Sequence, residues 1–251
     1  MTRSPSLTVR EAVVLAAGNG DRFQNGTRQS KLLHAVLGQP LILRTLATAA
    51  AAGITSFEVV LGYQADSVRR VVERGAPRGT RVHFTYNAEW HLENGVSVLA
   101  ARHRFADRRF ALLMGDHLFE APVLSMLGRV PAGANESILA IDTQPATPEV
   151  AAEATQVRLD GDYITAIGKG LGDYDALDTG LFVCAPALFD ALTAARASGD
   201  TTLSGGIRRL AARRLMRAAD VGGASWYDID TLADLTTAEG LLSAEPQPEP
   251  A

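Results

Sequence analysis

A glycine-rich segment with two cations is the first feature of this sequence that is suited to chemistry. The segment follows the apolar run Ala12–Ala16. Arg22 lies within the segment, and Lys31 follows it. Its glycines are Gly18, Gly20 and Gly26. Glycines let the backbone approach a phosphate chain and turn N–H groups toward it, while the cations add charge-assisted hydrogen bonds. The pattern predicts a phosphate-binding loop; a plain tight turn after a strand is the structural alternative.

Three carboxylates form a second group. Asp116 directly follows the apolar run Phe110–Gly115, and Asp228 and Asp230 alternate in the segment WYDID. A carboxylate at the tip of a buried strand is costly to bury unless it meets a cation, and beside a bound phosphate chain the cation that prefers carboxylate and phosphate oxygens is Mg²⁺. We predict Mg²⁺ at Asp116, with Asp228 or Asp230 as a further ligand, and keep a turn-capping Asp116 as the alternative. Asp228 is favoured, because Asp230 or Thr231 is also placed to cap the final helix.

Two other glycine motifs do not fit. A dinucleotide-binding fingerprint requires a third glycine where the chain has Phe23, and an acid after the next strand, where it has Leu61–Tyr63. A P-loop requires Gly-Lys followed by Ser or Thr, but Gly168 and Lys169 are followed by Gly170. The sequence therefore disfavours both a nicotinamide-dependent oxidoreductase and a P-loop nucleotidase.

Length, charge and cysteine content bound the class of protein. The 251 residues suffice for one domain, which we place at residues 1–243, and the Pro/Glu-rich segment 244–251 is predicted to be a disordered tail. A net charge of −4 argues against nucleic-acid binding. There is no signal-peptide pattern and no apolar run of about 18 residues, so we expect a cytoplasmic protein that does not bind a membrane. The single cysteine, Cys184, lies in an apolar run and is predicted to be a core residue.

Strands and helices alternate in the first half of the chain. The expected strands are 12–16, 57–61, 81–86 and 110–115, and the expected helices are 40–52, 66–74 and 95–104. This order predicts an α/β fold with a Rossmann-like, mixed but mostly parallel sheet flanked by helices. Ligands bind such sheets at the carboxyl ends of the strands, which is where the glycine-rich segment and Asp116 would lie.

The pattern changes in the second half. Short β-like runs at 137–142, 154–159, 163–167 and 176–184 predict an antiparallel hairpin layer added to the sheet, where a second substrate could bind. Lys169, between two glycines, is suited to the phosphate of an acceptor, or is a solvated surface lysine. Helices are expected at 186–197 and 203–214, and the arginines of the second should form a solvated face. These arginines are Arg208, Arg209, Arg213 and Arg214.

Three further groups of residues are candidates for substrate contacts. The helix entered through Asn94, Gly95 and Ser97 offers small residues and unpaired N–H groups, which suit a base or a phosphate; an ordinary helix cap is the alternative. His117 is placed either for a substrate contact or for packing. The predicted acceptor-binding residues are Asp116, His117, Glu153, Asp178, Thr179 and Gly180.

Several segments resemble a known enzyme family. Residues 15–22, LAAGNGDR, match the LAAG-x-G-x-R signature of nucleotidyltransferases, with Ser30 where most of them have proline before the lysine. The blocks MGDHLFE at 114–120, EATQVRLDGDYITAIGKGL at 153–171 and YDALDTGLFV at 174–183 are similar to the CTP:inositol-1-phosphate cytidylyltransferases. The resemblance covers nearly all of residues 11–240. In that family the domain is often fused to a membrane synthase, which we do not find here.

The resemblance implies an activity and a role for each candidate. CMP would be transferred from CTP to inositol 1-phosphate, giving CDP-inositol and pyrophosphate in an Mg²⁺-dependent reaction. Arg22, Lys31 and Lys169 would be catalytic, with Mg²⁺ on the carboxylates. The nucleotide would be bound by Leu15, Ala16, Ala17, Gly18, Asn19, Gly20, Asn94, Gly95 and Ser97.

Other acceptors and another class of function stay open. Phosphocholine and hexose 1-phosphates are acceptors of neighbouring families, and a non-catalytic nucleotide-binding protein would use the same binding residues. A homodimer also stays open.

We expect the Lys31→Ala variant to lose activity while its folding is nearly unaffected.

Overall fold

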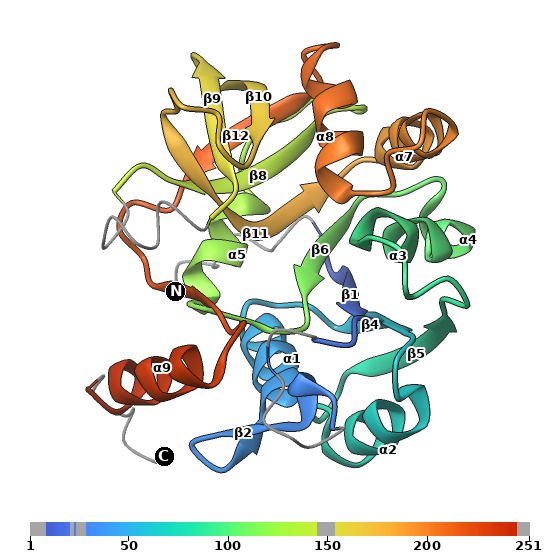
Figure 1. The fold of residues 1–251 in the computed structure, drawn as a ribbon, viewed down its shortest axis with the longest axis vertical. Coiled ribbons are helices and arrows are strands. Elements are labelled where there is room, and N and C mark those ends of the chain that lie inside the picture. Colours follow the sequence, from blue (N-terminus) through green and yellow to red (C-terminus); the bar gives the residue numbers. More distant parts are fainter. Residues whose placement is uncertain (1–8, 21–22, 24–28, 145–153, 245–251) are drawn as a thin grey trace, which may run out of the picture.

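The computed structural model describes residues 9–20, 23, 29–144 and 154–244. A nine-stranded sheet runs through the molecule, from β5 at the lower right of Figure 1 to β9 and β10 at the top. The strand order is β5-β4-β1-β6-β11-β8-β12-β10-β9. The strands are β1 (Glu11–Ala16), β4 (Ser56–Leu61), β5 (Arg81–Tyr86), β6 (Phe110–Met114), β8 (Ser137–Asp142), β9 (Gln156–Asp160), β10 (Tyr163–Gly168), β11 (Ala176–Cys184) and β12 (Met216–Asp220).

The first four strands of that order are parallel. β1 pairs with β4 on one side and β6 on the other, and β4 pairs with β5. The chain thus runs outward from β1 to β5 and returns to β6 on the other side of β1. At such a switch point the loops that follow the two central strands separate, which opens a crevice at their carboxyl ends. The segment after β1 and the residues after β6 therefore lie at the same place, as predicted.

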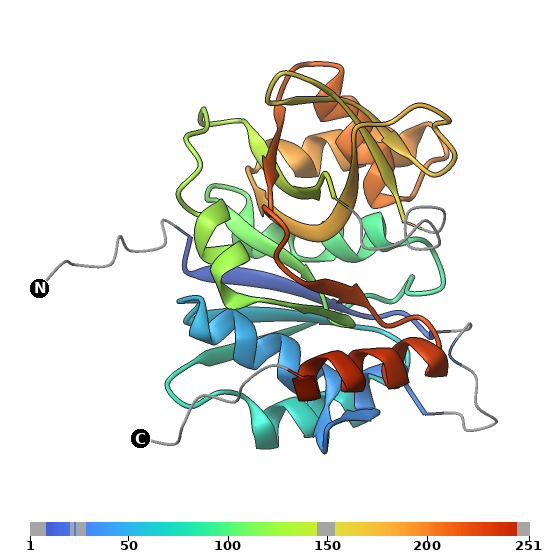
Figure 2. The ribbon, with the colours of Figure 1, turned by 90° about the vertical axis from the view of Figure 1, so that its left-hand side faces the viewer.

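Helices cover both faces of the sheet. The residues of β1 alternate between two apolar cores, because successive side chains of a strand point to opposite faces: Val14 belongs to one core and Val13 to the other. The first core packs under α1 (Leu41–Ala51), α2 (Ala65–Gly75) and α5 (Ala121–Leu127), and α1 and α5 face the viewer in Figure 2. The second packs under α3 (Asn94–Ala100), α4 (Arg102–Phe105), α7 (Ala187–Ala197) and α8 (Leu203–Ala211).

The second half of the chain extends the same sheet. β11 is antiparallel to both β6 and β8, and β9 and β10 form an antiparallel hairpin at the far edge. The predicted hairpin layer is therefore continuous with the parallel strands. β12, which has the sequence MRAAD, was not predicted; it pairs in parallel with β8 and is only partly apolar. The predicted helix 95–104 is divided into α3 and α4, and Cys184 is buried in the second core as predicted.

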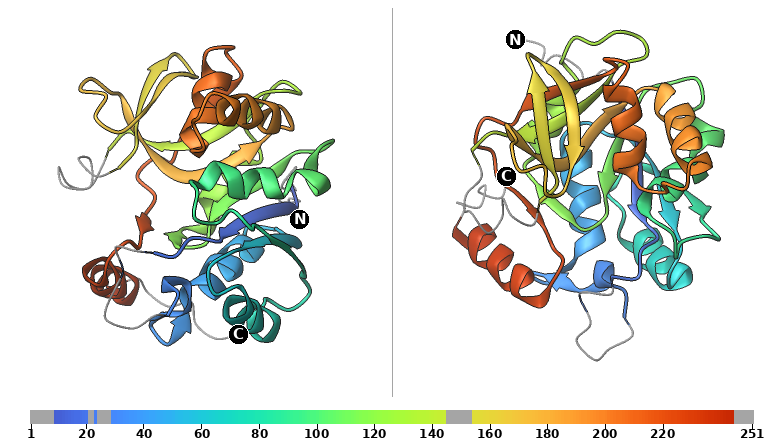
Figure 3. Two further views of the ribbon diagram at one scale, coloured as in Figure 1. Left: turned by 45° about the vertical axis from the view of Figure 1, so that its right-hand side comes forward. Right: turned by 45° about the horizontal axis from the view of Figure 1, so that its top comes forward.

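The C-terminal segment returns to the carboxyl ends of β1 and β6. β13 (Trp226–Asp228) pairs antiparallel with β7 (His117–Phe119), directly after Asp116. α9 (Leu232–Ala244) follows and lies beside the ribbon of β2 (Ala35–Val36) and β3 (Gln39–Pro40), which both views of Figure 3 show. The 3-10 helix η2 (Lys31–Leu33) precedes that ribbon. None of the helices in the described ranges is both long and apolar enough to cross a membrane.

Gly95 joins α3 to α8 through a close approach. A Cβ placed on Gly95 would lie 2.6 Å from the carbonyl oxygen of Thr201 and 2.7 Å from that of Thr202. These are backbone atoms at the start of α8, so they cannot move aside as the end of a flexible side chain could. The sequence predicted Gly95 as a nucleotide contact, and the structure places it against the neighbouring helix.

We expect Gly95→Ala to lower the free energy of unfolding by about 1–3 kcal/mol, the usual cost of overpacking a filled interior. Gly240→Ala in α9 is the matched control, because a Cβ there would meet nothing within 4 Å. The control should be neutral or stabilise by up to about 1 kcal/mol, since alanine is the better helix former. Urea denaturation measures both, and equal stability of the two variants would contradict the packing role of Gly95.

Candidate active site

A cavity of about 1530 Å³ opens at the carboxyl ends of β1 and β6. It is bounded by the segment after β1, the segment from Trp90 into α3, the ends of β8, β10 and β11, the start of α8, and residues 223–230. Most residues that the sequence predicted for a site line this one cavity. They are Leu15, Ala16, Ala17, Gly18, Asn19, Gly20, Lys31, Asn94, Ser97, Asp116, His117, Lys169, Asp178, Gly180, Asp228 and Asp230.

Four predicted residues do not appear in that lining. Gly95 packs against α8, and Thr179 is fully buried with its hydroxyl donating to the carbonyl of Ala140 at 2.9 Å. Arg22 and Glu153 lie outside the described residues. The roles of these two remain predictions.

Lys31 lies at the centre of the site. Its Nζ is 2.7 Å from Oδ2 of Asp116 and 2.9 Å from Oδ1 of Asp230, and it donates to the carbonyl of Ile229 at 2.9 Å. An ammonium group has three donors, so these three acceptors satisfy it. Lys31 thus ties η2 to the end of β6 and to the segment between β13 and α9.

Burial and charge act in opposite directions on this group. Burial lowers the pKa of Lys31, but the carboxylates of Asp116, Asp228 and Asp230 outweigh it and raise the pKa above its usual range. Burial likewise raises the pKa of Asp116, and the ammonium of Lys31 outweighs it and lowers that pKa. Both groups are therefore charged at neutral pH.

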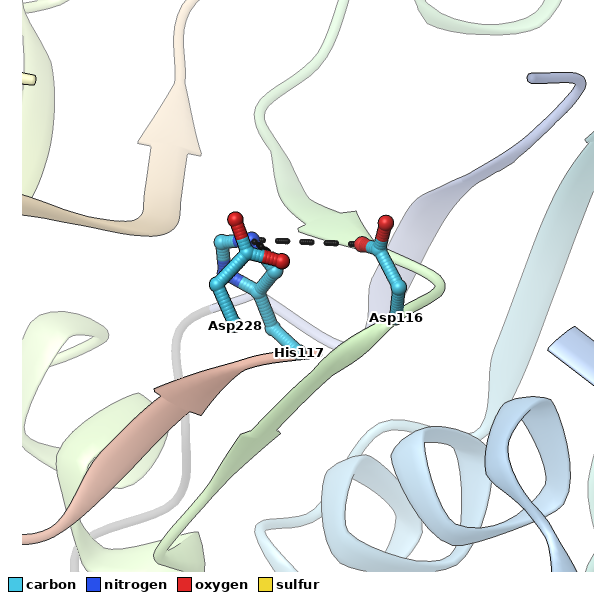
Figure 4. A group of neighbouring side chains, drawn as sticks. All are labelled: Asp116, His117 and Asp228. Carbon is cyan, nitrogen blue, oxygen red and sulfur yellow. Dashed lines mark ion pairs between the residues drawn. The ribbon is translucent and has the colours of Figure 1, made fainter. Parts of the chain in front are cut away.

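Asp116, His117 and Asp228 form a second cluster beside Lys31. One ligand atom from each lies within 4.8 Å of the others, and Figure 4 shows the three side chains directed toward one another. The backbone brings them together, because His117 on β7 is the cross-strand partner of Asp228 on β13. His117 Nε2 is 3.4 Å from Oδ1 of Asp228 and 3.9 Å from Oδ1 of Asp116.

His117 carries a positive charge in this arrangement. Burial lowers its pKa, but the carboxylates of Asp228 and Asp116 prevail and raise it to about 9. Its other nitrogen, Nδ1, donates to the carbonyl of Thr179 at 3.1 Å. His117 is thus a charged partner of the two carboxylates.

The chemistry of the two carboxylates fits a divalent cation. Mg²⁺ prefers carboxylate oxygens and is commonly held by one or two of them together with substrate phosphates. Asp116 and Asp228 both line the cavity, and a carboxylate oxygen of one lies within 4.8 Å of a carboxylate oxygen of the other. They are the residues that would hold Mg²⁺, while the protonated imidazole of His117 fits less well.

The structure corrects one expected competing role of Asp230. Thr231 caps α9: its hydroxyl accepts from the N–H of Asp234 at 3.2 Å, and Asp234 Oδ2 accepts from the N–H of Thr231 at 2.6 Å. This is a reciprocal capping pair. The carboxylate of Asp230 is instead paired with Lys31, so its removal acts on Lys31 and not on the helix cap.

Asp178 and Gly180 shape the wall next to His117. Asp178 Oδ1 accepts from the N–H of Gly180 at 2.8 Å, where the β11–β8 pairing is interrupted by a bulge. Gly180 has φ +75°, and a Cβ there would lie 2.2 Å from the ring of His117. Only glycine meets both conditions. Burial raises the pKa of Asp178 to about 6.

Two further cationic side chains line the cavity. Lys169 and Arg208 both line it, and no ion pair to Lys169 occurs in the described ranges. Lys31 and Lys169 are the two lysines of the chain, so both contribute to this cavity. Arg208 was predicted on a solvated face; it is held by Asp200 Oδ2 at 2.6 Å and by the carbonyl of Ile167 at 3.3 Å.

Sequence reasoning missed several lining residues. Trp226 donates from Nε1 to Oδ2 of Asp142 at 2.9 Å, which ties β13 to the end of β8, and Trp90 lines the cavity next to α3. Asp142 ends a predicted strand as Asp116 does, so the same signal could have found it. The tryptophans gave no comparable signal, because aromatic residues are more often core residues.

Comparisons with known proteins agree with this geometry. Residues 12–217 match the family model of the MobA-like NTP transferase domain. A Rubrobacter xylanophilus protein named bifunctional IPC transferase and DIPP synthase is 36% identical over 92% of this chain and 51% of its own length. A Streptomyces rubellomurinus protein named CMP-5'-(3-aminopropyl)phosphonate synthase is 28% identical over 96% of this chain and 40% of its own. The chain thus spans about half the length of the curated relatives it matches.

Solved structures share the fold. The inositol-1-phosphate CTP transferase from T. maritima superimposes with a TM-score of 0.82 at 24% identity, covering 94% of this chain and 96% of that one. A UDP-glucose pyrophosphorylase complexed with UDP-glucose superimposes with a TM-score of 0.76 at 17% identity, covering 94% of this chain and 98% of that one. The match over residues 12–217 includes most of the strands and helices around the cavity, and on this ground the chain belongs to the MobA-like NTP transferase domain family.

Proposed function

We propose that this chain transfers CMP from CTP to inositol 1-phosphate, releasing pyrophosphate. The observation that carries the proposal is the 36% identity, over 92% of the chain, to a relative named as an IPC transferase. Relatives of the same name in Aquifex aeolicus and Archaeoglobus fulgidus add support at 29% identity each. The proposal concerns only the transferase activity, because the chain spans about half of these relatives.

The reaction needs two anions held in line. A phosphate oxygen of the acceptor attacks the α-phosphorus of CTP, the new P–O bond forms, and the bond to pyrophosphate breaks. No covalent intermediate on the protein is required, so catalysis consists of positioning and charge stabilisation. Lys169 and Arg208, which line the cavity, would neutralise an acceptor phosphate, and the residues that follow β1 would offer backbone N–H groups to the triphosphate.

The carboxylates have a different task. Asp116 and Asp228 would hold Mg²⁺, which neutralises phosphate oxygens when it is bound. Lys31 keeps Asp116 ionised and contacts the carboxylates of both Asp116 and Asp230. Asp178 supplies a carboxylate that accepts hydrogen bonds from ring hydroxyls of the acceptor.

One observation favours a second acceptor class. Asp142 and Asp178 also line the cavity, and their carboxylates would suit an ammonium group. The relative from Streptomyces rubellomurinus is named for an aminopropylphosphonate product. Aminoalkylphosphonates therefore belong in any test of the acceptor.

A pyrophosphate-release screen tests the proposed function. The four nucleoside triphosphates are each combined with Mg²⁺ and with inositol 1-phosphate, phosphocholine, glucose 1-phosphate or 3-aminopropylphosphonate. We expect release with CTP and inositol 1-phosphate above all other pairs. Release with another acceptor only would reassign the substrate, and nucleotide binding without release from any pair would mark a non-catalytic binding protein.

Removing Lys31 should affect both stability and activity. The Lys31 side chain is 11% exposed, and its loss removes the ammonium group that the carboxylates of Asp116 and Asp230 both contact. We expect Lys31→Met to lower the free energy of unfolding by about 3 kcal/mol. This is the lower end of the usual cost of breaking a buried ion pair, because both carboxylates are partly exposed to solvent. These contacts lead to a different expectation from the sequence alone, which predicted nearly unaffected folding for Lys31→Ala. Lys169→Met is the matched control and should lose activity at unchanged Tm; equal Tm for both variants would contradict the tethering role.

Asp116→Asn keeps the shape of the side chain and removes its charge. We expect pyrophosphate release to fall at least about 100-fold, comparable to the loss of one group that stabilises developing charge. Mg²⁺ titration of the CTP-bound protein should show weaker binding. Asp190→Asn is the control, because Asp190 is an exposed acid paired with Arg102 outside the cavity. Full activity of the Asp116 variant, or activity of the wild type in EDTA, would refute the assignment.

Asp178→Asn should act on the acceptor more than on the nucleotide. The amide replaces one acceptor oxygen with a donor, so it cannot accept two hydroxyl hydrogen bonds as the carboxylate does. We expect the KM for inositol 1-phosphate to rise about tenfold while the Kd for CTP stays within about twofold. Steady-state kinetics and nucleotide titration measure the two quantities. Parallel losses in both would place Asp178 outside the acceptor site.

A further inference from the structure

The hydrogen bonds around Ser97 fix the direction in which its hydroxyl can donate. Ser97 lies on α3, lines the cavity and is 6% exposed. The side-chain nitrogen Nδ2 of Asn87 lies 3.0 Å from Ser97 Oγ. Asn87 follows β5 directly, is 4% exposed and is anchored by its own N–H to the carbonyl of Leu61 at 2.8 Å. Both partners are therefore held by regular structure.

The orientation of the Asn87 amide follows from a backbone contact. The N–H of Glu89 lies 2.9 Å from the other end of that amide. A backbone N–H can only donate, so the atom that it meets must be the carbonyl oxygen Oδ1. Nδ2 then faces Ser97 and donates to it. The contact with Glu89 excludes the flipped amide.

This arrangement limits the direction in which the hydroxyl of Ser97 can donate its hydrogen. A serine hydroxyl has one hydrogen, and that hydrogen cannot point at a group that is itself donating. Serines within helices often donate to the carbonyl three or four residues earlier, but Ser97 Oγ donates to no acceptor among the described residues. The hydroxyl therefore donates into the cavity.

A fixed donor distinguishes the two pyrimidine bases. Ring nitrogen N3 of cytosine carries a lone pair and accepts a hydrogen bond, whereas N3 of uracil carries a hydrogen and donates one. A donor that faces N3 is paired by cytosine and opposed by uracil. A site built around one such hydrogen bond rejects uracil, because the buried donor of the site would then be left without an acceptor.

The position of Ser97 suits a base contact. α3 packs against β1 and β4, so Ser97 lies on the side of the cavity next to the segment that follows β1. Trp90, which precedes α3, also lines the cavity and is an aromatic side chain of the kind on which bases stack. We propose that Asn87 is a positioning residue that fixes Ser97 as a hydrogen-bond donor to the base and thereby selects cytosine over uracil. The inference rests on the proposed use of CTP as the nucleotide donor.

Asn87→Asp provides the sharpest test, because it reverses the polarity of the contact. A carboxylate only accepts, so it keeps the bond from Glu89 and draws the hydrogen of Ser97 toward itself. Ser97 then presents a lone pair to the base, which uracil N3–H can use. We expect the wild type to bind CTP at least about tenfold more tightly than UTP, and this ratio to fall about tenfold in the variant.

Two variants guard against misfolding of the carboxylate variant. Ser97→Ala should weaken the binding of CTP and leave the binding of UTP nearly unchanged. Asn87→Ala should lower the ratio of CTP to UTP affinity, because the Ser97 hydroxyl can then turn. Ser137→Ala is the matched control: Ser137 is a fully buried serine whose Oγ accepts from the N–H of Ala185 at 3.0 Å, and it lies outside the cavity lining. It should keep the wild-type ratio.

Calorimetric titration of each protein with CTP and UTP, in Mg²⁺ and without acceptor, separates this inference from the proposed function. A wild-type preference for CTP that is unchanged in the Asn87 and Ser97 variants overturns the inference and leaves the proposed function standing. Equal losses of CTP and UTP also overturn it, since they would mean that Ser97 meets an atom shared by both bases. A ratio that falls as expected supports the inference even if no acceptor releases pyrophosphate. A wild type that prefers UTP overturns both.

Discussion

The contact of Lys31 with Asp116 and Asp230 is the interaction on which the site depends. It joins three segments that are far apart in sequence: η2, the end of β6, and the residues before α9. Burying such charges is costly, and the cost is offset only when attraction and hydrogen bonds are nearly complete. Here the ammonium has three acceptors, and the carboxylates hold its pKa above the usual range despite burial. The C-terminal segment is therefore held at the cavity by charge as well as by the β7–β13 pairing.

The strand order explains why these segments can meet at all. β1 and β6 are neighbours in the sheet, although the chain passes through β4 and β5 between them. Their carboxyl ends lie side by side, and the backbone N–H of Gly115 donates to the carbonyl of Leu15 at 2.9 Å. The glycine-rich segment and Asp116 are thus adjacent through backbone pairing. The β7–β13 ribbon then adds Asp228 to the same place.

The sequence predicted the parts of this arrangement that depend on local pattern. β-like patterns located the strands β5 and β8 with correct bounds. Asp116 was identified because it follows the apolar run of β6. β12 was missed because MRAAD lies near the edge of the sheet and lacks an apolar run. The partners of Lys31 and of Gly95 were also missed, since both are set by distant segments whose packing no local pattern records. The amide of Asn87 belongs to the same class: its role follows from which atom faces Glu89.

The balance of charge in the cavity connects the site to its substrates. Among the described lining residues there are seven acids and three lysine or arginine side chains, with His117 as a fourth positive group. The acids are Glu93, Asp116, Asp142, Asp178, Asp228, Asp230 and Asp234. Two phosphorylated substrates would meet a net negative field in such a cavity, and like charges at close range repel. A divalent cation held by Asp116 and Asp228 would offset two of these negative charges. The same carboxylates that would repel a bare triphosphate would therefore favour a triphosphate that arrives with its metal.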